Sequence, residues 1–202
     1  MLTTHFMAFF AGGVVPDSLA PVTLAEAKAH LRIVDDADDD YIAALVEAAA
    51  DKIERDTGHV CRTRNVSVVR DSFADAGQMR IPLNYGPVNS IASVVYDADT
   101  GTEQTLAADQ YRLRQFAALT YIIPAYGVTW PTTESIIGAV RVTLNAGYAT
   151  NDDVPDTLRH AALLLIGHWF ENREAVAVGM TSTDTPLGYE ALIRPHRLRM
   201  VA

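Results

Sequence analysis

Residues Asp156 to Glu174, DTLRHAALLLIGHWFENRE, decide the fold, because their middle from Ala161 to Gly167 is apolar on almost every side of a helix. Pro155 suits the first helical position, and Asp156 suits the positive end of the helix dipole. The apolar run is too short to cross a bilayer, which needs about 20 apolar residues. We therefore predict a helix that is buried by the rest of the chain or by copies of itself.

Three other segments carry helical patterns that could supply this cover. Thr23 and Glu26 form a capping box at the start of a short helix. From Asp38 to Thr57 the apolar residues recur every three or four positions, and Gly58 is a typical helix stop. A last short helix is predicted from Pro186 to Ile193. None of these helices is stable alone at its length, so they are expected to pack together.

Between these helices the apolar period changes from about 3.6 to two, which indicates strands. Clusters such as Asp97 to Gly101 have the chemistry of turns. The pattern predicts a small antiparallel sheet or barrel. The predicted strands are Asn65–Arg70, Val88–Tyr96, Thr102–Leu106, Tyr111–Phe116, Leu119–Ile123 and Val140–Leu144.

The predicted fold class is α+β, a bundle of about four helices with a small antiparallel β-lobe inserted between the second and third long helices. Residues 21–60 and 150–193 are expected to form the bundle, and residues 61–149 the inserted lobe. Residues 1–20 precede the first pattern and are interpreted as an N-terminal arm, because no basic residue precedes Lys28 as a signal peptide would require. Residues 194–202 form a basic C-terminal tail.

The composition excludes some classes of function. A chain of 202 residues that is 49% hydrophobic and 20% charged is an ordinary globular protein. Its net charge of −9 argues against a protein that grips DNA by its phosphates. The single cysteine, Cys61, excludes an internal disulfide, and no neighbouring base supports a catalytic thiol.

Candidate catalytic and metal-binding residues are few. His168 with Glu171 or Glu174 could form the acid–base pair of a small hydrolase, but we interpret the two glutamates as the solvated end of a buried helix. His160 and His168 lie eight residues apart, and zinc would need further ligands. The acidic run from Asp35 to Asp40 lacks the glycine and final glutamate of a calcium loop. No catalytic residue, cofactor or metal site is predicted.

Several motifs in order resemble those of phage head–tail connector proteins, which occur in long-tailed phages and in gene transfer agent particles. The resemblance covers about Pro21 to Met200. Several motifs in the right order are more specific than any one of them, and one is the run Gly167 to Glu174, GHWFENRE, at the end of a proline-led helix. The other motifs are Thr23–Leu31, the pair Thr57-Gly58, Tyr121–Gly127 followed by Trp130-Pro131, Ala146-Gly147-Tyr148 and the segment Pro186–Arg199.

This resemblance implies a structural adaptor rather than an enzyme. Family members form a ring, twelve-fold in the particle, beneath the portal protein. The ring extends the channel through which DNA leaves the head without sequence-specific binding, and it provides the docking platform for stopper or tail proteins. We therefore expect a location in the neck of a virion or phage-like particle assembled in the host cytoplasm, with no membrane partner. A sibling neck role, as stopper or tail completion protein, stays open.

Two groups of site residues follow from this interpretation. The basic tail resembles a portal-docking arm, with Arg194, Pro195, His196, Arg197, Leu198 and Arg199 as candidates. The buried helix is expected to supply a core spine or a contact with the next subunit, through Leu158, Leu165, His168, Trp169 and Phe170.

Overall fold

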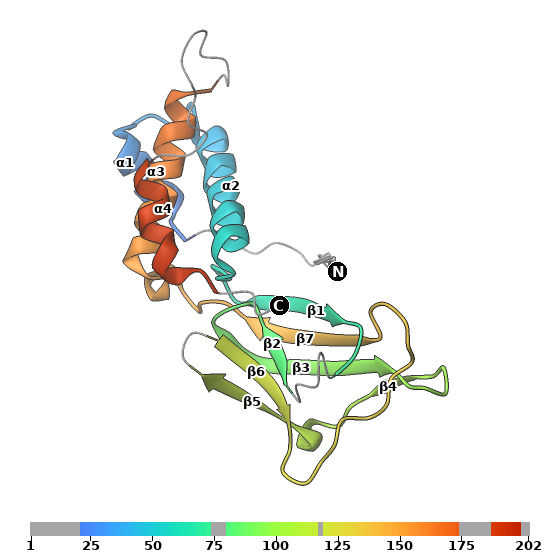
Figure 1. The fold of residues 1–202 in the computed structure, drawn as a ribbon. Helices are drawn as coiled ribbons and strands as arrows, with labels where there is room; N and C mark the ends of the chain where they lie inside the picture. Colours follow the sequence, from blue (N-terminus) through green and yellow to red (C-terminus); the bar gives the residue numbers. More distant parts are fainter. Residues whose placement is uncertain (1–20, 74–79, 117–118, 174–186, 199–202) are drawn as a thin grey trace. The chain divides into compact units, whose positions relative to one another are not determined.

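The computed structural model describes residues 21–73, 80–116, 119–173 and 187–198. They form two compact units, a helical unit of residues 21–62 and 148–197 and a β unit of residues 63–147 with Leu198. Within the described ranges the chain has four α-helices and seven strands, and every strand lies between the second and third helices in sequence (Figure 1). The predicted α+β class is confirmed.

Local sequence signals set the ends of the helices. Thr23 and Glu26 form the expected capping box before α1, with the Glu26 amide donating to Thr23 Oγ1 at 3.2 Å. Gly58 ends α2 in the left-handed conformation, with φ of 79°, where it donates to the carbonyl of Glu54. The four helices are α1 (Leu24–Leu31), α2 (Asp39–Thr57), α3 (Asp156–Glu171) and α4 (Leu187–Ile193).

The decisive helix is shorter than predicted. α3 ends at Glu171, whereas the sequence pattern continued to Glu174. Asn172 accounts for the difference, because its side-chain amide donates to the carbonyl oxygen of His168 at 2.8 Å and satisfies a group that the helix end would leave open. Glu174 itself lies outside the described residues.

The core of the helical unit surrounds α3. Leu158, Leu165 and Ile166 are fully buried there, and the core also includes residues of α2 and α4. Burial of one such side chain contributes about 1.5–3 kcal/mol. α3 contacts α1, α2 and α4, so its apolar residues are covered to a large extent by their own chain. No helix among the described residues is long and apolar enough to span a membrane.

The β unit consists of two open antiparallel sheets rather than a barrel. One sheet has the order β1-β7-β3-β4 and the other β2-β6-β5, and all six predicted strands form with ends shifted by at most two residues. The pattern missed β2, which is only three residues long and contains Pro82. The strands are β1 (Arg64–Arg70), β2 (Ile81–Leu83), β3 (Val88–Asp97), β4 (Glu103–Thr105), β5 (Tyr111–Phe116), β6 (Leu119–Pro124) and β7 (Val140–Ala146).

One arginine joins three strands of the larger sheet. Arg141 of β7 makes a bidentate pair with Asp97 of β3, at 2.9 and 3.0 Å, and contacts Glu103 of β4 at 2.6 Å. The hydrogen bonds from Arg141 hold the pKa of Asp97 below its usual range. This network fixes β4, whose three side chains are otherwise exposed.

Candidate functional site

Among the described residues the structure records no contact between His168 and Glu171, and Glu174, the other candidate partner, lies outside them. His168 is half-buried on α3, and its recorded polar partner within the described residues is Asn172, whose amide nitrogen lies 3.5 Å from the ring Nδ1. Glu171 is exposed at the last residue of the helix. No group of three or more His, Cys, Asp or Glu side chains in the described ranges could hold a metal ion.

The residues around His168 instead fasten the end of α3 to the start of α2. The guanidinium of Arg173 lies over the rings of Tyr41 and Phe170, at 4.6 and 4.8 Å, and also contacts Asp38 at 3.0 Å. Such cation–π contacts contribute about 0.5–1 kcal/mol each at exposed sites. The hydroxyl of Tyr41 donates to the backbone carbonyl of Trp169 at 3.5 Å. We call these four side chains (Asp38, Tyr41, Phe170 and Arg173) the helix clamp.

The start of α3 is fastened to α1. Arg159 pairs with Glu26, the acidic member of the capping box. Burial opposes ionisation of Glu26, but the hydrogen bonds from Thr23 and Arg159 outweigh it and lower its pKa. Gly167 lies where a side chain would meet His30 of α1, since an added Cβ would be 3.4 Å from the imidazole Nε2. Arg159 and Gly167 thus set how α3 packs against α1.

The structure places the predicted spine residues in or against the helical core. Leu158 and Leu165 are fully buried, and Trp169 and Phe170 are half-buried and pack against the core. His168 of this group is also half-buried. A role of these residues in contacts between subunits stays a prediction.

The predicted docking residues of the C-terminal segment differ in their surroundings. Arg194 and Pro195 are exposed in a short 3-10 turn that continues from α4, whereas Arg197 pairs with Glu190 at 2.7 Å. Leu198 is half-buried, and Arg199 lies outside the described residues. Arg194 and Pro195 are therefore exposed, as is Arg197, but only Arg197 of the three has an ion pair recorded among the described residues.

His196 joins a small, partly buried polar cluster. Its ring Nε2 lies 2.6 Å from Oγ1 of Thr157, and its ring packs edge-on against His59 with centroids 5.7 Å apart. His59 in turn lies 2.8 Å from the hydroxyl of Tyr148. Burial and the neighbouring His196 lower the pKa of His59 to about 4, and burial also lowers the pKa of His196. Sequence spacing could not find this cluster, because its members come from four separate segments.

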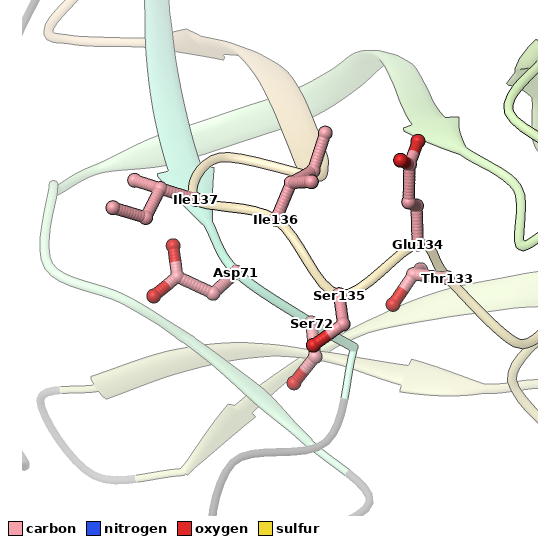
Figure 2. Close-up of a pocket in the computed structure, with 7 residues that line it drawn as sticks. All are labelled: Asp71, Ser72, Thr133, Glu134, Ser135, Ile136 and Ile137. Carbon is pink, nitrogen blue, oxygen red and sulfur yellow. The ribbon is translucent and has the colours of Figure 1, made fainter.

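The β unit contains a shallow pocket of about 390 Å³ near the end of β1. Figure 2 shows Asp71 and Ser72 on one side and the loop of residues 133–137 on the other. The carboxylate of Asp71 accepts from the amide of Gly138 at 2.9 Å, which holds this loop in place. The lining has two carboxylates, three hydroxyls and two isoleucines but no imidazole, amine or thiol.

The described part of the chain thus has a braced helical scaffold and no catalytic constellation. A family model described as "Phage gp6-like head-tail connector protein" matches residues 21–98 and 132–197, which is most of the chain. The chain belongs to this family. The connector is therefore a structural protein of the phage neck rather than an enzyme, as the sequence motifs indicated.

Three solved structures contain chains similar to the connector. A chain of the "Neck of native GTA particle computed with C12 symmetry" is 25% identical with a TM-score of 0.73, and each chain covers 98% of the other. A chain of the "Virion of native gene transfer agent (GTA) particle" is 25% identical with a TM-score of 0.72, at 95% and 96% coverage. The neck of the empty particle, computed with C6 symmetry, shares the fold at 24% identity, 98% coverage of both chains and a TM-score of 0.74. A search of curated proteins finds no match.

The family match divides the connector's β unit. Both stretches of the helical unit fall inside the match from residue 21 onward, together with β1, β2, β3 and β7. Residues 99–131, which contain β4, β5 and β6, fall outside it. The similar neck chain nevertheless extends over this region, since the match covers 98% of both chains.

Proposed function

We propose that the connector forms a ring beneath the portal protein in the neck of a gene transfer agent or phage particle. In this position the ring extends the DNA exit channel and provides the platform on which stopper or tail proteins dock. The observation that carries the proposal is the similarity over 98% of both chains to a protein in a neck computed with C12 symmetry. A repeated, head-to-tail contact that closes is the usual way to build such a ring.

The charge of the connector supports a channel through which DNA moves freely. Residues 14–62 and 148–197 carry 18 acidic and 9 basic side chains, and the remaining residues carry 7 of each. All but one unit of the net charge of −9 therefore resides in the helical unit, and Asp17 accounts for the other. An acidic surface repels phosphates and offers no counterion release to hold DNA, so a wall of this kind lets DNA slide.

Portal docking is assigned to the accessible part of the C-terminal segment. Arg194 and Pro195 are exposed at the end of α4, and the described contacts of His196 and Arg197 keep the turn folded against the helical unit. The docking element is thus a short turn on the helical unit, continued by the basic residue Arg199.

Loss of the connector tests the proposed function. In cells that produce the particle, deletion of the gene should leave filled heads and free tails, and the wild-type gene supplied in trans should restore joined particles. Counting joined and separate particles by negative-stain electron microscopy gives the readout. Normal joining without the connector would overturn the proposal.

A second experiment tests portal docking and separates the connector from a stopper protein. Arg194→Glu should weaken co-purification of the connector with the portal protein, whereas Arg55→Glu, an exposed arginine on α2, should not. Cross-linking in assembled particles should join the connector directly to the portal. Cross-links to a second neck protein but none to the portal would instead favour the stopper role.

A further inference from the structure

The smaller sheet of the β unit has an outward face of unusual composition. Alternate residues of β5 point to opposite sides of the sheet. Leu113 packs against the core of the β unit opposite the buried Ile122, so Arg112, Arg114 and Phe116 point the other way. All three are exposed, and Phe116 is 77% exposed. We call these three side chains the arginine face.

The arginine face has no partner in its own chain among the residues that the structure describes. Arg141, Arg159 and Arg173 each pair with a carboxylate, but no ion pair or hydrogen bond is recorded for the side chain of Arg112 or Arg114. β5 is also an edge strand, since it pairs with β6 alone. Arginines beside an exposed aromatic ring are the residue types that dominate binding energy at protein interfaces.

The helical unit carries a segment of the opposite character, in the loop between α1 and α2. Val34 is 93% exposed, which is unusual for an aliphatic residue, and it is followed by the exposed Asp35 and Asp36. The side chain of Asp36 is 87% exposed although it contacts Lys28. We call Val34, Asp35 and Asp36 the acidic loop.

Internal contacts hold the acidic loop in a defined shape. Lys28 lies 2.7 Å from Asp36 and 2.6 Å from Asp39, which connects the loop to both flanking helices. Arg32 turns the chain with φ of 59°, and the amide of Ile33 donates to the carbonyl of Lys28 at 3.0 Å. The loop therefore presents its aliphatic side chain and carboxylates without a large ordering cost on binding.

We propose that the arginine face of one connector subunit docks on the acidic loop of the next subunit in the ring. An aromatic ring with two cations then meets an aliphatic side chain with two carboxylates, which matches both apolar and charged character. The pairing joins two different patches, as a head-to-tail ring requires. This inference rests on the proposed ring. It also gives the nearly neutral β unit and the acidic helical unit complementary roles in one contact.

Charge exchange between two variants tests the pairing. One variant carries Arg112→Glu and Arg114→Glu, and the other carries Asp35→Lys and Asp36→Lys, which leaves the Lys28–Asp39 pair in place. In particle-producing cells each variant alone should lower the number of joined heads and tails about tenfold or more, because like charges then face each other across the contact. Expression of both variants together should restore joining, since alternating subunits again present opposite charges at every contact.

Matched controls separate this effect from a general loss of folding. Gln115→Glu adds a negative charge to the opposite face of the same strand, and Asp152→Lys reverses an exposed carboxylate elsewhere on the helical unit. Both should join heads and tails as wild type does, and circular dichroism should show that all variants are folded.

The outcomes distinguish this inference from the proposed function. Wild-type joining by either charge-reversed variant would overturn the pairing while the connector role stands. Two defective variants that do not rescue each other would also overturn it and would assign the arginine face to another protein or to DNA. Normal joining in cells that lack the connector altogether would overturn the proposed function itself.

Discussion

In the helical unit, the arginines Arg159, Arg173 and Arg197 contact carboxylates of the same unit, whereas in the β unit Arg112 and Arg114 face outward without a recorded partner among the described residues. The helical unit also falls within the family match from residue 21 onward, while β5 and β6 do not. The difference teaches that these three arginines of the helical unit stabilise a scaffold that falls within the family match. Those of the smaller sheet are available for recognition.

The largest effect should come from the helical core. Leu165→Ala removes a fully buried side chain from α3, and we expect the free energy of unfolding to fall by about 2–5 kcal/mol. Urea denaturation followed by helical circular dichroism measures this change. Leu163→Ala, at a half-buried position of the same helix, is the control and should cost clearly less. If both variants lost the same free energy of unfolding, α3 would not have one preferred buried side.

The second effect is a pH dependence of the free energy of unfolding, and it should be confined to the helical unit. The pKa of His59 is lowered to about 4, so between pH 6.5 and 4 the unfolded chain binds a proton that the folded chain does not. Stability should therefore be unaffected above pH 6.5 and fall by about 3 kcal/mol as the pH drops to 4.

Two comparisons make this pH prediction specific. His59→Gln should flatten the pH dependence, because glutamine has no proton to gain. Residues 63–147 contain no histidine, so the hydrogen-exchange protection factors of the β unit, which correct for the pH dependence of intrinsic exchange, should change little over the same interval. An unchanged pH profile in the glutamine variant would contradict the assignment to His59.

A smaller effect is expected from a partly buried hydrogen bond in the helical unit. The hydroxyl of Tyr189 donates to Asp56 at 2.8 Å, and burial together with this carboxylate raises the pKa of the phenol. Tyr189→Phe should lower the free energy of unfolding by about 1–2 kcal/mol, because Asp56 then loses one of its partners. Thermal unfolding gives the measurement. A gain in stability would mean that burying the hydroxyl destabilises the fold by more than its hydrogen bond stabilises it.

The smallest effect should come from the arginine face. Arg112→Ala with Arg114→Ala should change the free energy of unfolding by no more than about 0.5 kcal/mol, as is usual for exposed positions. Arg141→Ala is the contrasting variant in the same unit and should destabilise it measurably, because Asp97 and Glu103 lose their shared cation. A large loss of stability in the double variant would contradict the view that Arg112 and Arg114, unlike Arg141, do not stabilise the β unit.

Local chemistry allowed much of the fold to be predicted. The capping box of Thr23 and Glu26, the stop at Gly58 and the alternation from Val140 to Leu144 each depend on neighbours a few residues away. The short strand β2 was not predicted, because three residues with a central proline are too few to show an alternation of apolar and polar residues. Pro82 can be assigned to a strand only from its pairing with β6 in the structure.

Contacts between distant segments explain what the sequence did not reveal. The helix clamp joins Asp38 to Arg173 across 135 positions, and His196 meets Thr157 across 39. Nothing in the spacing of GHWFENRE distinguishes an arginine that lies over two aromatic rings from one at a solvated helix end. The motif could be assigned to a family of proteins, but its physical role required the packing of α2 against α3.

The burial of Cys61 has a practical consequence for labelling chemistry. Cys61 is the only cysteine of the chain and is fully buried in the helical core. The native connector should therefore react slowly with maleimide reagents while it stays folded, and its thiol should become reactive when the helical unit opens. A single introduced surface cysteine would then carry a fluorophore or spin label without removal of the natural one.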